Sequence, residues 1–427
     1  MIKGIKIMLL PNNKQQTKLF QFAGAKRFAY NWTLAKQIDN FKNGNKLLSD
    51  GVLRKEFTQL KKLDDYLWLN TISNNVMKQA IKDCCIAYKR FFQTQKRTGI
   101  KYTKETLQKC AKQNKKPSFY DINGHPKFKS KKNDNPKFYQ DNIKIQFNKT
   151  YVKLECISNS KKKNRQQLNW IKLAEKDRIP YGKDVKYVNP RVSFDGIHWW
   201  ISVGIEYSDN LDIPRNNGIG IDVGVKDLAI CSDKRVYKNI NKSTKVLKLK
   251  KKHKRLQRQV SRKYDNLKQD KVYKKGETPK KTNNIIKLEH RILKTQHKLN
   301  NIRNNYIHQT TSEIVKRKPS YITIEDLNIQ GMMKNKHLAK AIQEQCLYEF
   351  SRQLKYKTWW NNTELRLVDR WYPSSKTCHE CGYIKKDLKL SDRVYICPKC
   401  GYIENRDYNA SLNLRDCNEY KVYRMVV

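Results

Sequence analysis

Two cysteine pairs constrain the fold of this chain more than any other feature. Cys378 and Cys381 form one C-x-x-C pair, and Cys397 and Cys400 form a second one after fifteen intervening residues. Each C-x-x-C turn points two sulfurs the same way, so the pairs can close a tetrahedral shell around one Zn²⁺ if the linker folds back as a hairpin. A pair of disulfides is the alternative. We expect a structural zinc ribbon, because four cysteines leave no coordination position open for water.

The charge of the chain restricts its partners. Ninety-one Lys and Arg residues stand against 39 Asp and Glu residues, which leaves a net charge of +52 on 427 residues. Self-repulsion of that size is tolerated when a polyanion neutralises it, so we expect nucleic acid as the partner. A membrane is disfavoured, because no apolar run approaches the length that spans a bilayer and the basic residues occur in every segment. The length predicts two or three domains.

The cysteine count indicates the compartment. The chain has eleven cysteines, an odd number, and we find no signal peptide, lipidation motif or organelle-targeting motif. Together these features predict reduced thiols. We expect a cytoplasmic protein that is associated with the nucleoid when it is bound to DNA.

The spacing of apolar residues changes twice in the first half of the chain. Residues 1–10 alternate as a strand does, and between 11 and 114 apolar residues recur at spacings of three and four, which predicts helices. From 115 to 210, turn residues separate short period-two stretches that predict strands. We therefore expect a small β-barrel made from 1–10 and 115–210, with a helical domain of residues 11–114 inserted into it.

Two features of this half are compatible with contacts to nucleic acid. Phe28, Tyr30 and Trp32 include candidates for base stacking, although aromatic residues at helical spacing are more typical of a core. A basic segment around Phe128 matches a loop that contacts phosphates, with a solvated lysine run as the alternative. Its lysines are Lys127, Lys129, Lys131 and Lys132.

A second domain begins at about residue 218. The segment GIGIDVGVKDLAICSD predicts an apolar strand with an acid, Asp222, in its middle. Residues 242–317 contain two long basic helical stretches, which predict an antiparallel helical hairpin.

Three acids in this domain stand out by their surroundings. A charged side chain is costly in an apolar strand unless it is paired or binds metal, and Asp222 lies in such a strand. Glu325 ends a second apolar strand, and Asp407 precedes a predicted helix just after the ribbon. Carboxylates are suitable ligands for Mg²⁺, and hydrolysis of a phosphodiester by water needs divalent metal ions of this kind. Each acid alone is compatible with an ordinary strand-end carboxylate, and the neighbouring acids Asp227 and Asp326 are alternatives.

The order of these acids, the ribbon and the basic composition together resemble the RuvC nuclease domain of the TnpB family. This family comprises transposon-encoded RNA-guided nucleases related to type V CRISPR effectors. The resemblance covers much of 218–416, and over residues 1–210 it is one of layout. It rests on GIGIDVGVKDLAI, ITIEDLNIQGM, RWYPSSKTCHECG and CPKCGYIENRDYNASLNL, with HPKFKSKK as a weaker match.

The resemblance implies a specific architecture. An α+β multidomain protein is expected, with an N-terminal β-barrel wedge that carries a helical recognition insertion. The C-terminal half should be an RNase H-like RuvC domain with a zinc ribbon inserted. The implied boundaries of the RuvC domain are 218–370 and 402–427, with the basic hairpin of 242–317 inside it, and the ribbon covers 371–401.

It also implies an activity and a site. Asp222, Glu325 and Asp407 should bind two Mg²⁺ ions for DNA cleavage, and the four cysteines should bind Zn²⁺. The expected function is that of an RNA-guided endodeoxyribonuclease encoded by a transposable element. It should cut double-stranded DNA complementary to a bound guide RNA, next to a short motif. We expect one copy of the chain on each RNA rather than two.

Three other functions stay open at this point. The first is a compact type V CRISPR effector. The second is an RNA-guided DNA-binding protein that no longer cuts, although the complete set of acids argues against it. The third is a transposase that joins strands itself. The common form of such a transposase has its three acids in the chain order Asp, Asp, Glu, whereas the order here is Asp, Glu, Asp.

Overall fold

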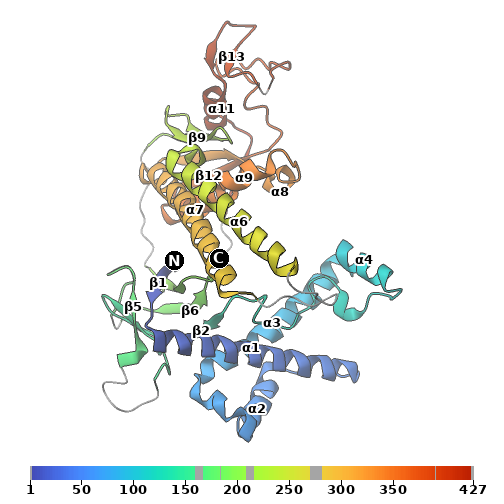
Figure 1. The fold of residues 1–427 in the computed structure, drawn as a ribbon. Coiled ribbons are helices and arrows are strands. Elements are labelled where there is room, and N and C mark those ends of the chain that lie inside the picture. Colours follow the sequence, from blue (N-terminus) through green and yellow to red (C-terminus); the bar gives the residue numbers. More distant parts are fainter. Residues whose placement is uncertain are drawn as a thin grey trace. The chain divides into compact units, whose positions relative to one another are not determined.

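The computed structural model describes residues 2–158, 167–182, 184–207, 216–269, 281–389 and 391–424. The chain divides into two compact units, Met1–Ser208 and Asp209–Val427. In Figure 1 the first unit runs from blue into green and the second from green to red. None of the helices in the described ranges is long and apolar enough to cross a membrane.

Helices fill the first part of the N-terminal unit, as the sequence pattern predicts. The longest, α1, begins after Asn12, whose side chain accepts a hydrogen bond from the Gln15 N–H, while the Gln15 side chain accepts one from the Asn12 N–H, each at 2.9 Å. This reciprocal cap satisfies two N–H groups that the helix itself leaves unpaired. The helices are α1 Asn13–Lys42, α2 Asp50–Leu60, η1 Asp64–Thr71, α3 Asn74–Thr98, α4 Lys104–Lys112 and η2 Phe119–Asp121.

A seven-stranded antiparallel sheet completes this unit. Its strands lie in the order β2-β6-β7-β1-β5-β4-β3, so the N-terminal strand β1 is central and pairs with both β7 and β5. Residues 1–10 therefore join the later strands in one sheet across the helical insertion. Closure of the sheet into a barrel stays a prediction. The bounds are β1 Ile2–Leu10, β2 Lys137–Tyr139, β3 Gln146–Phe147, β4 Tyr151–Lys153, β5 Trp170–Leu173, β6 Tyr187–Phe194 and β7 Trp199–Glu206, with the short helix η3 at Gln167–Asn169.

The C-terminal unit contains a six-stranded mixed sheet in the order β10-β9-β8-β11-β12-β15. The central strand β11 runs parallel to β8 and β12, and the other pairs are antiparallel. The strands are β8 Ile219–Val223, β9 Asp227–Cys231, β10 Val236–Lys238, β11 Tyr321–Glu325, β12 Glu364–Val368 and β15 Tyr420–Val422.

One strand prediction was wrong. GIGIDVGVKDLAICSD is a hairpin of β8 and β9, in which Asp222 pairs with Ile230, rather than a single apolar strand. The turn falls at Gly224, Val225 and Lys226, where a glycine and an exposed lysine interrupt the apolar run. The hairpin places Asp222 near the end of β8 rather than in the middle of a long strand.

The predicted basic hairpin is present and antiparallel. Tyr264 near the end of α6 donates to Glu289 near the start of α7 at 2.6 Å, and Arg303 farther along α7 donates to Asn241, just before α6, at 2.7 Å. The helices of this unit are η4 Ile240–Lys242, α6 Thr244–Gln269, α7 Asn283–Lys316, α8 Ile329–Met332, α9 Ala339–Gln345, α10 Leu347–Trp360 and α11 Arg406–Arg415. Strand β13 Val394–Ile396, within the ribbon, pairs with β14 Ile403–Asn405, which follows it.

Candidate active site and metal centre

The three predicted acids come from β8, β11 and α11, far apart in the sequence. Strand β8 pairs with β11 from Ile219–Ile322 to Ile221–Ile324, so Asp222 and Glu325 are the next residues along two neighbouring parallel strands. Helix α11 packs on these strands and carries Asp407 in its first turn. The structure thus gathers all three acids at one edge of the sheet.

Asp222 is the electrostatic centre of the group. Burial, and after it the nearby carboxylates of Glu325 and Asp407, raise the pKa of its carboxyl from 3.8 to about 8. The Arg406 guanidinium opposes this rise. Because both acids act on Asp222, the group concentrates negative charge that a divalent cation would neutralise.

Glu325 has a fixed orientation. The buried Ser374 hydroxyl donates to Glu325 Oε1 at 2.6 Å. Burial raises the pKa of Glu325, whereas the hydrogen bond from Ser374 lowers it. The carboxylate therefore keeps one oxygen paired and the other available for a ligand.

Asp407 lies inside helix α11 rather than before it, which corrects the expected helix start. Asn405 caps the helix, because its side-chain oxygen accepts from the Asp407 N–H at 3.0 Å and from the Tyr408 N–H at 3.1 Å. A carboxylate in the first turn is favoured by the helix dipole. Arg406 donates to Asp407 Oδ1 at 3.0 and 3.1 Å, so a cation already neutralises part of this carboxylate.

Gly220 sets the distance between β8 and α11. A Cβ at this position would lie 2.0 Å from the Ser411 carbonyl oxygen and 2.3 Å from the Arg415 nitrogen. Only a residue without a side chain allows this approach. Since Asp222 and Asp407 lie on these two elements, the glycine allows the strand and the helix that carry them to approach closely.

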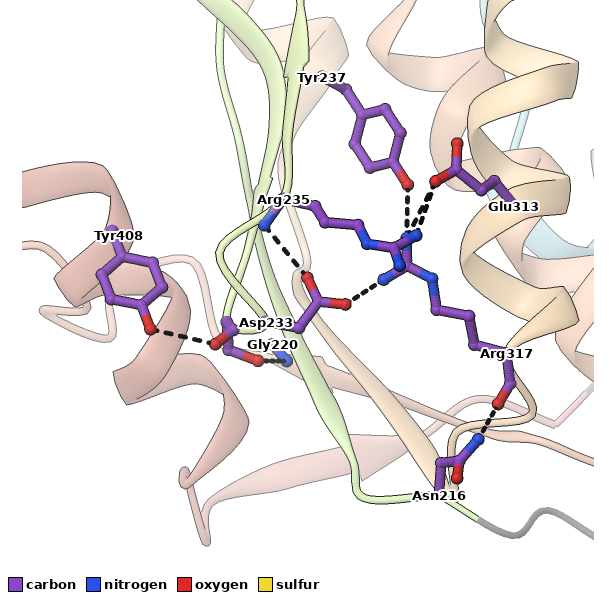
Figure 2. Close-up of polar contacts among 9 residues, drawn as sticks. Asn216, Gly220, Asp233, Arg235, Tyr237, Glu313, Arg317 and Tyr408 are labelled. Carbon is purple, nitrogen blue, oxygen red and sulfur yellow. Dashed lines mark hydrogen bonds and ion pairs between the residues drawn. The ribbon is translucent and has the colours of Figure 1, made fainter.

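Ser232 links the same elements through hydrogen bonds to Gly220 and Tyr408, both labelled in Figure 2. Its hydroxyl accepts from the Gly220 N–H at 3.0 Å, and its own N–H donates to the Gly220 carbonyl at 2.9 Å. The Tyr408 hydroxyl donates to the Ser232 carbonyl at 3.3 Å. These contacts tie the β8–β9 hairpin to the helix that carries Asp407.

Arg317, after the end of α7, anchors the far side of this hairpin (Figure 2). It pairs with Asp233 in the turn between β9 and β10, with Glu313 at 3.0 Å, and donates to the Tyr237 hydroxyl at 3.1 Å. Arg235 also pairs with Glu313, at 2.8 Å. These contacts hold β10 and the turn between β9 and β10 against α7.

The four predicted cysteines form a metal-binding arrangement. Their sulfurs all lie within 4.8 Å of one another, with 3.6 Å between Cys378 and Cys400 and 3.5 Å between Cys381 and Cys397. A tetrahedron with Zn–S bonds of about 2.3 Å has edges of about 3.8 Å, so the spacing fits zinc. A disulfide needs about 2.05 Å, and all four thiols are free, which argues against the disulfide alternative.

The two halves of the ribbon repeat one local geometry. The Cys378 N–H donates to the Tyr383 carbonyl at 2.8 Å, and the Cys397 N–H donates to the Tyr402 carbonyl at 2.9 Å. Each turn ends at a glycine with a left-handed backbone, Gly382 at φ 72° and Gly401 at φ 74°. Equivalent turns point two sulfurs each toward one centre.

Two asparagines of α11 hold the start of the ribbon. Asn413 donates to the carbonyls of Ser374 at 2.8 Å and Thr377 at 2.7 Å. Asn409, one turn earlier, donates to the Thr377 carbonyl at 2.7 Å and accepts from the His379 N–H at 3.1 Å. The same helix therefore carries Asp407 and positions the loop that holds Ser374 against Glu325.

The alternative acids have other surroundings. Asp227 begins β9 and pairs with Lys238 at 3.5 Å. Asp326 follows β11, where its N–H donates to the Val368 carbonyl at 2.8 Å. Neither is among the groups that shift the pKa of Asp222. This difference favours Glu325 and Asp407 as its partners.

The four lysines of the basic segment differ from one another. Lys127, Lys131 and Lys132 are exposed. Lys129 is half-buried, pairs with Asp134 at 3.4 Å, and exchanges backbone hydrogen bonds with the Asn31 side chain at 2.8 and 2.9 Å. Lys129 therefore has a structural role, and contact of all four lysines with phosphate stays a prediction.

Ser374, Arg406 and Gly220 were not identified from the sequence. Arg406 directly precedes Asp407, and Ser374 lies in YPSSKTC beside the ribbon, so both were adjacent to recognised motifs. The contact between Ser374 and Glu325 bridges 49 residues and required the fold. Gly220 carried no sequence signal beyond being a glycine in a strand.

Comparison with known proteins gives matches along most of the chain. Three family models match, described as "Helix-turn-helix domain" over residues 1–46, "Probable transposase" over 203–336 and "Cas12f1-like, TNB domain" over 348–414. The chain is 28% identical to "Putative RNA-guided DNA endonuclease InsQ" of Escherichia coli K12, over 97% of this chain and 91% of that protein. It is 24% identical to a "Putative RNA-guided DNA endonuclease" of Streptomyces pristinaespiralis, over 96% and 88%.

A solved structure shares the fold. The protein chain in a cryo-EM structure of a Cas12f1–sgRNA–target DNA complex aligns with a TM-score of 0.50 at 15% identity, covering 99% of both chains. The likeness therefore extends over both units.

Proposed function

The chain belongs to the TnpB family, and on that premise we propose that it is a metal-dependent DNA endonuclease guided by a bound RNA. It would be encoded by a transposable element and would cut double-stranded DNA that is complementary to the RNA, next to a short motif. The observation that carries the proposal is the gathering of Asp222, Glu325 and Asp407 at one sheet edge, with the pKa of Asp222 raised by burial and by the other two acids.

The acids suit Mg²⁺ by their chemistry. All three offer hard carboxylate oxygens, and burial together with the other two carboxylates raises the pKa of Asp222. We assign Asp222, Glu325 and Asp407 as the residues that would hold the Mg²⁺ ions. Bound there, Mg²⁺ would polarise the phosphate, lower the pKa of the attacking water and neutralise the leaving oxygen.

The protein's own groups prepare this site. Ser374 holds Glu325 in one orientation, and Gly220 with Ser232 sets the approach of Asp222 and Asp407. Arg406 pairs with Asp407 at 3.0 Å and orients its carboxylate. Fixed ligands of this kind lower the reorganisation that catalysis would otherwise require.

The rest of the chain would bind nucleic acid. A net charge of +52 suits a protein that holds an RNA–DNA duplex through its backbone and leaves sequence to base pairing. We assign the four cysteines to a structural Zn²⁺, which would hold the ribbon beside the active site.

A pair of aspartate variants tests the proposal. Asp222→Asn should abolish Mg²⁺-dependent cutting of DNA that matches the bound RNA, while leaving RNA binding intact. Asp227→Asn is the matched control, since Asp227 lies on the paired strand but faces Lys238. Cutting by Asp222→Asn at the wild-type rate, or loss of cutting in Asp227→Asn alone, would refute the assigned acids.

A further inference from the structure

A groove of about 920 Å³ lies along one face of α1 in the N-terminal unit. We call it the α1 groove. One wall is a stripe of α1 at helical spacing that includes Lys18, Gly24 and Phe28. The other wall comes from η1 and the residues after it, including Tyr66 and Trp68.

The second wall presents aromatic surface to solvent. Trp68 is 45% exposed, and its ring centroid lies 5.7 Å from that of Phe28 in an edge-on arrangement. The Phe28 centroid is 5.6 Å from that of Tyr66. A tryptophan that contacts one neighbouring ring and keeps 45% of its surface exposed offers aromatic surface of the kind on which a nucleobase stacks.

The charge of the groove suits a polyanion. Lys18 and Arg27 line it, and no acidic residue does so in the described part of the chain. Gln21 adds an exposed amide beside them. Aromatic surface flanked by cations is the combination that binds single-stranded nucleic acid.

Gly24 is an independent indication. It lies inside helix α1, where glycine is less favourable than alanine. A Cβ at Gly24 would meet nothing within 4 Å, so packing within the protein does not require a glycine. Its absence of a side chain leaves the helix backbone open to close approach by a ligand in the groove.

We propose that the α1 groove binds an unpaired nucleotide of the guide RNA, with its base stacked on Trp68 and its phosphates against Arg27 and Lys18. The inference rests on the proposed function, which supplies the RNA partner. Leu67, next to Trp68 in η1, and Leu63, just before η1, are 48% and 56% exposed, and exposed apolar side chains of this kind favour a ligand that stays bound. Under the proposed function the guide RNA would stay bound between cutting events, whereas a displaced DNA strand would be present only during them.

Binding of oligonucleotides to the full chain tests the stacking contact. Trp68→Ala should weaken binding of the single-stranded RNA U12 by about 5- to 150-fold, and Trp68→Phe should retain most of it. Neither variant should change binding of a twelve-residue abasic ribose-phosphate chain. Tyr181→Ala removes a similarly exposed aromatic side chain, 47% exposed, outside the groove and should have no effect. Equal weakening of U12 and abasic binding would overturn the stacking contact.

Two further variants separate ligand contacts from folding. Arg27→Gln should reduce the slope of log affinity against log salt by about 0.7, as the loss of one phosphate contact does, whereas Trp68→Ala should leave that slope unchanged. Gly24→Ala should raise the melting temperature of the free protein and yet weaken U12 binding. A glycine with only a structural role would not combine a higher melting temperature with weaker U12 binding on substitution. Unchanged U12 binding by Gly24→Ala would therefore count against the groove as the binding site.

The source of the nucleotide is tested with the guide RNA from the native locus, without DNA or Mg²⁺. Trp68→Ala should lower the affinity for that RNA. Unchanged RNA affinity, with loss only of target DNA binding, would overturn the assignment in favour of the displaced DNA strand. The assay requires no cleavage, so absence of cutting by the wild type would refute the proposed nuclease without deciding this inference.

Discussion

Replacing Gly220 with alanine tests the geometry that brings Asp222 and Asp407 together. The added Cβ would lie 2.0 Å from the Ser411 carbonyl oxygen, whereas ordinary contact begins at 3.4 Å. The atoms in the way belong to the backbone of α11, so the helix must move by roughly 1 Å or more. Asp407 lies one turn from Ser411 on the same helix and must move with it.

The expected cost is large for catalysis and moderate for stability. A misplacement of about 1 Å in a catalytic group can cost about 100-fold in rate. Overpacking of this kind typically costs about 1–3 kcal/mol in the free energy of unfolding. We therefore expect Gly220→Ala to cut target DNA about 100-fold more slowly at a temperature where the protein is still folded.

The assay compares single-turnover cutting by the RNA-loaded protein with thermal unfolding of the same preparation. Gly4→Ala is the matched control, because Gly4 also lies in a strand but its Cβ would meet nothing within 4 Å. That control should cut normally. Wild-type cutting by a folded Gly220→Ala variant would refute the close approach of β8 and α11 as a requirement of the site.

Three other predictions concern residues around the site and core of the same unit. Ser374→Ala should raise the Mg²⁺ concentration needed for half-maximal cutting by about 10- to 100-fold, with partial recovery in Ser374→Thr; an unchanged Mg²⁺ midpoint would exclude a positioning role. Cys397→Ser should lose zinc by atomic absorption and melt at a lower temperature, whereas Cys110→Ser should keep its zinc; normal zinc content in Cys397→Ser would contradict the four-cysteine site. Burial lowers the pKa of Lys357 from 10.5 to about 8, so the folded state loses this proton before the unfolded state does, and stability should rise between about pH 8 and 10.5. Urea unfolding should show this rise in the wild type relative to Lys357→Met; parallel pH profiles would refute it.

The sequence was sufficient for features with local signals. The four cysteines were predicted because their spacing is itself the geometric requirement for a tetrahedral site. Asp222 was predicted because an acid in an apolar strand is costly. The long helices α1, α6 and α7 were predicted because apolar residues recur along them at helical spacing.

Features that depend on contacts between distant segments were missed. The β8–β9 hairpin was treated as one strand, because both halves are apolar and only Gly224 and Lys226 mark the turn. The role of Ser374 depends on α11 holding its loop against Glu325. Gly220 has a role only because α11 crosses it at close range. No periodicity or spacing in the sequence encodes these contacts.

Purification of the protein from cells that carry its native locus tests the central claim most directly. The bound RNA would be sequenced, and the complex tested for Mg²⁺-dependent cutting of DNA that matches the variable end of that RNA. We predict one abundant RNA species, cutting of the matched DNA only, and loss of cutting in Asp222→Asn with the RNA retained. Absence of a specific RNA, or cutting that persists in Asp222→Asn, would contradict the account.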